Sequence, residues 1–295
     1  MIFLIGSILL SSWLTLAFKL CERYKINILQ AIVFNYLTCV ITGSLVNGSL
    51  PFTGKNIQSN WFLWAVSMGM LFIILFNIIG ITAQKTGVAV ASVANKSSLI
   101  IPFIFSVYLY NEKINGWGVI GIGLAILGVI LTCYRSGGKT GVGEKNNNRW
   151  LLLPLALFVG SGLLDTIIKY IQHNFLNPAT ENPFLIISFT TAFMAGGIYL
   201  AIQLFLKKRG FELKAILAGI IIGIPNYFSI WCLVRFLKVS PWQSSASIPV
   251  NNMGIVLFSS VMAWLLFREH LSKINLIGIV LSIIAIYLIA FGDKI

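Results

Sequence analysis

Long apolar stretches, separated by short polar ones, fill almost the whole chain. Each stretch holds roughly 20 mostly apolar residues, the length that an α-helix needs to cross the hydrocarbon core of a bilayer. We therefore expect an all-α integral membrane protein with ten transmembrane helices. Their predicted bounds are 2–18, 28–46, 61–83, 87–110, 116–134, 150–172, 184–206, 214–237, 241–267 and 274–292.

The second half of the chain repeats features of the first. The stretch "YNEKINGWGVIGIGLAIL" returns 157 residues later as "FREHLSKINLIGIVLSII", an offset that aligns Glu112 with Glu269 and Asn95 with Asn252. Because each half has five spans, an odd number, the halves must enter the membrane in opposite directions and form two inverted five-helix repeats. The predicted division is a first repeat over 1–134, a linker loop over 135–149 and a second repeat over 150–295.

Composition supports a membrane protein and excludes several other classes. The chain is 58% hydrophobic and only 10% charged, too few charges to cover a soluble protein of this size. Its net charge of +13 does not indicate nucleic acid, because the basic residues lie at the ends of the apolar stretches. The first stretch lacks a basic leader and a cleavage site, so we expect a retained helix. The predicted location is the cell membrane, plasma or inner, with multiple passes.

Polar side chains inside apolar spans are costly and usually face the interior of a bundle or a cavity. The fourth and ninth predicted spans each carry several at helical spacing. They are interpreted as substrate contacts, or alternatively as hydrogen bonds between helices, worth about 0.6 kcal/mol each. These candidates are Ser92, Asn95, Lys96, Ser247, Asn251 and Asn252.

Asp165 is the only acidic residue well inside a predicted span. Lys169 lies one helical turn further on, so the two could form a structural ion pair. Alternatively, Asp165 accepts a proton or neutralises a cationic group of the substrate. The sequence leaves both interpretations open.

The eighth predicted span contains a proline, Pro225, within the stretch "GIPNYFSIWCLVRF". A proline frees the carbonyl four residues before it, and such interruptions often mark a transport site. Asn226, Tyr227 and Trp231 are therefore further candidates for substrate contact.

Glu112 and Glu269 each follow an apolar span, just before the next one begins. A carboxylate there suits the N-terminus of the following helix, where the helix dipole is positive. A gate contact is the alternative role.

The arrangement of five plus five spans resembles the EamA-like family of the drug/metabolite transporter superfamily. The residues that carry the resemblance are "YLYNEKI" and "LLFREHL" at the ends of the fourth and ninth spans, and Pro102 ahead of the first of them. The resemblance covers nearly the whole chain. It implies that the fourth and ninth spans line a central cavity. The chain has "FNY", Phe34–Tyr36, where the family often has a basic residue.

We expect a secondary transporter of small metabolites, working by alternating access. Lys96 and nearby lysines outnumber Asp165 in or near the spans, which favours amino-acid-like or other anionic or zwitterionic solutes. A membrane-embedded enzyme or a channel is the alternative; the sequence has no catalytic constellation, so no catalytic residue, metal or cofactor is expected. The expected partners are a small-molecule substrate, membrane lipids and a coupling proton if Asp165 carries one. The expected assembly is a monomer or homodimer, with no nucleic acid.

The lysines and arginines also predict an orientation. With ten spans both termini lie on one side, and most basic residues lie in loops on the other. Because cytoplasmic loops carry the excess of Lys and Arg, the charges predict that both termini are outside. The family resemblance implies that both are inside.

Overall fold

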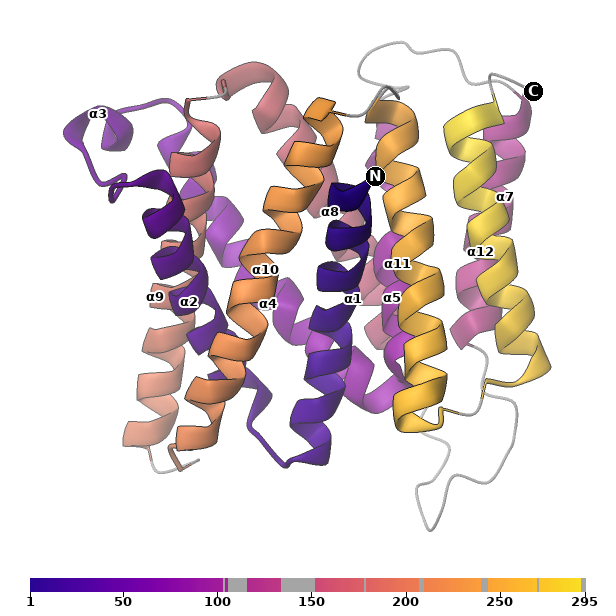
Figure 1. Cartoon of the computed structure of the whole chain (residues 1–295), viewed down its shortest axis with the longest axis horizontal. Helices are drawn as coiled ribbons and strands as arrows, with labels where there is room; N and C mark the ends of the chain where they lie inside the picture. Colours follow the sequence, from indigo (N-terminus) through magenta and orange to yellow (C-terminus); the bar gives the residue numbers. More distant parts are fainter. Residues whose placement is uncertain are drawn as a thin grey trace.

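The structure is a computed structural model, and it describes residues 1–102, 104–105, 116–133, 152–177, 179–206, 210–239, 244–269 and 271–292. These residues form helices and no strands (Figure 1). In chain order the helices are α1 (Ile2–Arg23), α2 (Ile28–Asn47), α3 (Gly54–Ile57), α4 (Phe62–Thr86), α5 (Val88–Ser97), α7 (Gly116–Cys133), α8 (Leu152–Phe175), α9 (Glu181–Phe205), α10 (Leu213–Val239), α11 (Ser244–Phe267) and α12 (Lys273–Phe291).

Six of the described helices are long and apolar enough to cross a membrane: α1, α2, α4, α9, α10 and most of α11. Four shorter apolar helices begin at the starts of α5, α7, α8 and α12. Each of the ten overlaps one of the ten predicted spans, although the number of crossings itself stays a prediction. The short helix α3 was not predicted, and it lies in the connection between α2 and α4.

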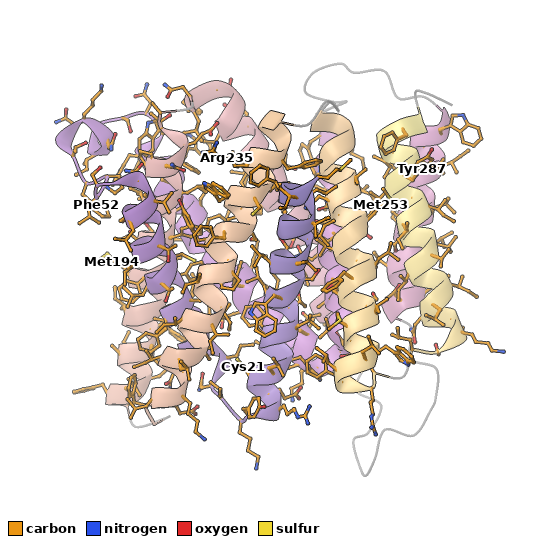
Figure 2. All side chains as sticks on the ribbon, viewed as in Figure 1. Cys21, Phe52, Met194, Arg235, Met253 and Tyr287 are labelled. Atoms are coloured by element: carbon orange, nitrogen blue, oxygen red, sulfur yellow. The ribbon has the colours of Figure 1, made fainter. Side chains whose placement is uncertain are left out.

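The bundle has two distinct ends. Helix α1 begins and helix α12 finishes at the same end, which we call the terminal end; the other is the distal end (Figure 1). Arg235 lies towards the terminal end, and Cys21, in the last turns of α1, lies near the distal end (Figure 2). The even number of apolar helices places both chain ends together, as the sequence predicts.

Helix α5 does not run unbroken through the predicted span 87–110. It ends at Ser97 in a turn, and helix resumes only after that turn. Pro102 has no N–H to donate four residues back. The carbonyl of Ser98 accepts instead from the N–H of Ile101, at 2.9 Å. The expectation of one continuous helix was therefore wrong within the described residues.

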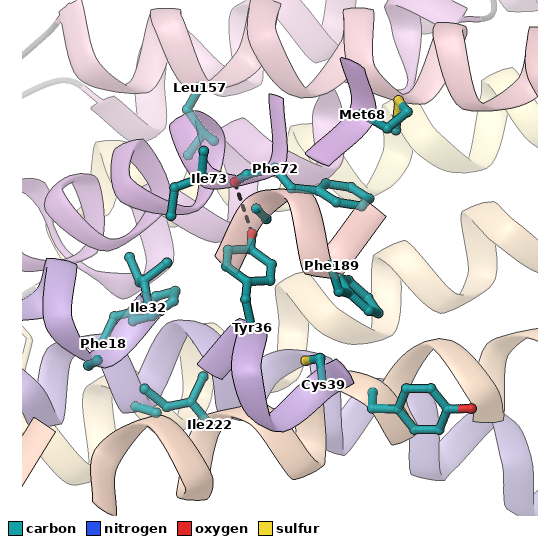
Figure 3. Close-up of a cluster of buried hydrophobic side chains, with 14 of the residues drawn as sticks. Phe18, Ile32, Tyr36, Cys39, Met68, Phe72, Ile73, Leu157, Phe189 and Ile222 are labelled. Atoms are coloured by element: carbon teal, nitrogen blue, oxygen red, sulfur yellow. Dashed lines mark hydrogen bonds between the residues drawn. The ribbon is translucent and has the colours of Figure 1, made fainter. Parts of the chain in front are cut away.

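The largest buried cluster draws mainly on α1, α2, α4, α9 and α10 and also includes residues of α5 and α8 (Figure 3). At its centre Tyr36 is fully buried, and its hydroxyl donates to the carbonyl of Phe72 at 2.9 Å. Phe189 of α9 stacks on Phe72 with ring centroids 5.8 Å apart. One tyrosine thus joins three helices while keeping its own hydroxyl satisfied, as burial of an O–H group requires.

The contacts between helices come in related pairs. Helix α2 packs against α10 as α4 packs against α9, and α1 against α10 as α4 against α8. Likewise, α1 packs against α11 as α5 against α8, and α11 against α12 as α5 against α7. The predicted repeat relates α1 to α8, α2 to α9, α4 to α10, α5 to α11 and α7 to α12. When each helix is exchanged for its counterpart, one contact of each pair becomes the other. This regularity supports the predicted duplication.

Helices α7 and α12 form a closely packed pair at one edge of the bundle (Figure 1). A Cβ atom added to Gly128 would lie 2.9 Å from the Ser282 nitrogen and 3.0 Å from the Gly278 oxygen. Gly123, on the same helix, has nothing within 4 Å of the corresponding position. Packing therefore requires glycine at position 128 but not at position 123.

Gly128→Ala should lower the melting temperature of the purified protein, because overpacking against a neighbouring backbone costs about 1–3 kcal/mol. Gly123→Ala is the matched control and should be neutral or stabilising, since alanine favours helix by about 1 kcal/mol. Equal melting temperatures for the two variants in the same detergent would contradict the close contact of α7 with α12.

Candidate substrate site

Two opposite charges lie in the interior of the bundle, Lys96 on α5 and Asp165 on α8. Asp165 stands 13 residues into a helix of 24, so it is about half way along its length of roughly 36 Å. Each charge acts electrostatically on the other. Neither makes an ion pair with another described side chain. The two charged groups are therefore neighbours, but they do not use their hydrogen-bonding atoms on each other.

Local backbone structure brings these charges together. A Cβ atom on Gly162 of α8 would lie 2.8 Å from the Ser98 carbonyl oxygen, at the break that follows α5. Gly162 is one turn before Asp165, and Ser98 is two residues after Lys96. A glycine on one helix and a break on the other thus allow the two backbones to approach closely where the charges lie.

Asp165 is exposed and Lys96 half-buried, although both lie deep within the bundle. Solvent that reached Asp165 there would keep its charge solvated. A charged group is tolerated at membrane depth under this condition. The side chain of Lys169, expected as a possible partner of Asp165, lies outside the described ones.

Buried polar side chains also occur on α5 and on α11, which packs against it. Ser92 is buried one turn before Lys96, and its hydroxyl has no hydrogen-bond partner among the described residues. Helix α11 packs against α5 and contributes Asn251 and Asn252, both buried. The side-chain oxygen of Asn251 is also without a described partner. Such open donors and acceptors are what a polar solute would need.

Asn95 and Ser247 are two further candidates on α5 and α11. Asn95 is half-buried, and its backbone carbonyl accepts a hydrogen bond from the Ser98 hydroxyl. The side chain of Ser247 lies outside the described ones. The other charge expected at a span end, Glu112, also lies outside the described residues.

The three candidates of α10 lie apart from this group. Asn226 donates to Asn35 of α2 at 3.2 Å, and both side chains are buried. Tyr227 is buried, and its ring lies 3.0 Å from where a Cβ atom on Gly43 would be. These contacts hold α10 against α2 rather than against α5.

Trp231, the third of them, belongs to an aromatic cluster towards the terminal end. Its ring meets Phe3 edge-on, with centroids 5.8 Å apart, and also contacts Phe228. The guanidinium carbon of Arg235 lies 5.1 Å from the centre of the Trp231 ring, a cation–π contact. The candidate residues thus fall into two groups, and only the group on α5, α8 and α11 contains charges.

The carbonyl freed by Pro225 has a partner that the sequence did not reveal. This carbonyl belongs to Ile221, and it accepts a hydrogen bond from the indole N–H of Trp13 at 3.1 Å. Trp13 belongs to α1, so the break in one helix is satisfied by another. The freed group is therefore used in packing and is not left open to a ligand.

Asn35 is the main residue that sequence reasoning missed. It is fully buried, it accepts from Asn226, and its own amide nitrogen has no described partner. The signal was present in the sequence, because Asn35 is a polar residue within the predicted span 28–46. Its polar side chain was noted without being assigned a role.

Glu269 contacts a different helix from the one expected. Its two carboxylate oxygens accept from the backbone N–H of Val88, at 2.9 and 3.2 Å, at the start of α5. Helix α12, which Glu269 precedes, is capped instead by Ser272 and Asn275 in a reciprocal capping box. Burial raises the pKa of the Glu269 carboxyl, although the Val88 N–H and Lys19 act in the opposite direction. The prediction that a helix N-terminus receives this carboxylate was right, but the helix was wrong.

The described residues contain no group of three or more His, Cys, Asp or Glu side chains that could hold a metal ion. Their charges, apolar helices and packing define a multi-pass membrane protein. The chain belongs to the EamA-like transporter family, whose model matches residues 1–134 and again 148–291. The resemblance to the drug/metabolite transporter superfamily is thereby confirmed.

Two individual proteins are similar to nearly the whole chain. An uncharacterized protein of Haemophilus influenzae is 27% identical over 298 residues, covering 99% of this chain and 98% of its own. A protein crystal structure matches with a TM-score of 0.63 and 13% sequence identity, over 99% of this chain and 96% of the other. At that identity the match supports the fold alone.

Trp13→Phe should destabilise the protein by about 1–2 kcal/mol, because it leaves the carbonyl of Ile221 without a donor in a bilayer core that offers none. Pro225→Ala restores a backbone N–H that can reach the same carbonyl. In the Pro225→Ala background, Trp13→Phe should therefore cost clearly less. Melting temperatures of the four proteins of this double-mutant cycle measure the difference. Purely additive effects would refute the capping role of Trp13.

Proposed function

We propose that this membrane transporter carries amino-acid-like or other anionic or zwitterionic solutes by alternating access. The observation that supports this most directly is the pair Lys96 and Asp165, neighbouring charges inside the bundle that make no described ion pair. A zwitterion offers a carboxylate for Lys96 and an ammonium group for Asp165. A simple anion would use Lys96 and the nearby polar groups alone.

The proposed alternating-access mechanism is supported by the relation between the two halves. Five spans in each half give two repeats of opposite orientation, and the related pairs of helix contacts agree with such a duplication. The site residues come from α5 of the first half and from α8 and α11 of the second. A site shared between the halves can open to either side as one half moves against the other.

A screen of purified protein by thermal shift tests the solute class. Neutral L-amino acids represent zwitterions, short dicarboxylates represent anions, and primary alkylamines represent cations. Zwitterions or anions should raise the melting temperature by several degrees at high concentration, since a ligand at 100 times its Kd stabilises by about 2.7 kcal/mol. Stabilisation by the amines alone would contradict the proposed class.

Lys96→Ala should abolish both that stabilisation and the counterflow of the same solute in proteoliposomes, because it removes the only cation of the charge pair. Asn252→Ala should act in the same direction. Lys55→Ala is a matched control, since Lys55 is an exposed lysine of α3. If Lys96→Ala and Asn252→Ala transport like the unmodified protein, the site is elsewhere.

Asp165→Asn distinguishes the two roles that the sequence leaves open. If Asp165 carries a coupling proton, the variant should lose its response to an imposed pH gradient while solute exchange continues. The measurement is solute flux in proteoliposomes with and without the gradient. A variant that keeps the gradient response but melts at a lower temperature would assign Asp165 to structure.

A further inference from the structure

The packing of the two halves is regular but not fully symmetric. Helix α1 packs against both α4 and α5. In the predicted repeat the counterparts of these contacts join α8 to α10 and α11. Within the described residues α8 makes no comparable contact with either helix. In the first half α4 and α5 therefore pack against α1. In the second half α10 and α11 lack the corresponding contact with α8.

Two hydrogen bonds join α1 to α4 at the distal end of the bundle. The Lys19 ammonium donates to the carbonyl of Gln84 at 2.8 Å, and the Gln84 side chain donates to the carbonyl of Phe18 at 3.0 Å. These two bonds join the end of α1 to the end of α4. Both lie within the first half of the chain, so they cannot alone hold the two halves together.

Glu269 supplies the contact between the halves. Its carboxylate lies 181 residues from Val88 and accepts the N–H that begins α5. This N–H has no partner within its own helix, and a negative charge suits a helix N-terminus. The contact therefore joins the end of α11 to the start of α5, the helix that carries Lys96.

Gly87 makes room for this carboxylate. Its φ of +107° is a conformation that side chains rarely adopt, and a Cβ atom there would lie 3.0 Å from Glu269 Oε2. Arg268, next to Glu269, also has a positive φ, of 51°. Backbone conformations of low occurrence on both sides of one contact indicate that the surrounding structure imposes it.

We propose that Glu269 is a positioning residue for transport, a latch that holds the distal end shut while the Lys96–Asp165 site is open towards the terminal end. This inference depends on the proposed alternating-access transport. The exposure of Asp165 and the loose packing of α8 on α10 and α11 agree with an opening on that side. Release of the latch would let α5 move away from α11 and open the site distally.

A latch must also be able to release in every cycle. Burial of the Glu269 carboxylate opposes its charged form, and Glu22 of α1 acts in the same direction. The Val88 and Ala89 N–H groups and Lys19 favour the charged form. Burial and Glu22 thus oppose the charged form that makes this contact, whereas the neighbouring N–H groups and Lys19 support it.

Distances between spin labels at Lys85→Cys and Lys273→Cys, in a background without the four native cysteines, test the latch directly. Both positions are exposed and flank the contact on its two sides. Glu269→Ala should raise the ratio of long to short distances about tenfold, the change expected for loss of one charge-assisted hydrogen bond. Glu269→Gln, which keeps one acceptor oxygen, should change the ratio less. Gly87→Ala, which disturbs the contact from the other side, should reproduce the opening.

Glu181→Ala is the control, because this carboxylate belongs to the first turn of α9, a helix that takes no part in the contact. It should leave the distances unchanged. The latch is refuted if neither Glu269→Gln nor Gly87→Ala shifts the distances, even where Glu269→Ala fails to fold. The measurement needs no solute, so a wrong transport proposal would appear separately, as opening without any solute flux.

Discussion

Every backbone polar group inside this bundle must find its partner within the protein, because a bilayer core offers none. Three interruptions show how the chain meets that constraint. The carbonyl freed by Pro225 accepts from Trp13 of another helix. The break after α5 is satisfied locally, by the N–H of Ile101. The N–H that begins α5 is satisfied by Glu269, from the other half of the chain. The arrangement of the helices depends on these remote partners.

Charges inside the bundle meet a different requirement. Lys96 and Asp165 could satisfy each other in a direct ion pair, yet they make none with a described side chain. Two uncompensated charges at membrane depth are costly unless a cavity solvates them, and the exposure of Asp165 agrees with such a cavity. A site that stays partly open in this way retains its capacity for a charged solute. A buried, fully formed ion pair would instead have to break before a solute could bind.

The sequence predicted the positions of the helices well, and the partners of their polar residues less well. Helix positions follow from apolar length alone, and Lys96 and Asp165 stand out because charged residues are rare within spans. The partner of Asn226 could not be predicted, because α2 and α10 meet only in the folded chain, 191 residues apart at Asn35. The same applies to Glu269, whose nearest helix in sequence is α12 but whose hydrogen bonds go to α5. Local rules place a carboxylate at a helix N-terminus without specifying which helix.

The departures from symmetry carry more functional information than the symmetry itself. A duplicated chain whose halves packed identically would be closed, or open, at both ends at once. Here α1 closes on α4 and α5, whereas α8 stays apart from α10 and α11 within the described residues. Since the two halves have different sequences at their ends, the contacts that close each end need not be equally strong. In the proposed alternating-access cycle, the balance between the two conformations would therefore be set by residues such as Glu269 and Gly87, which lie away from the candidate solute site.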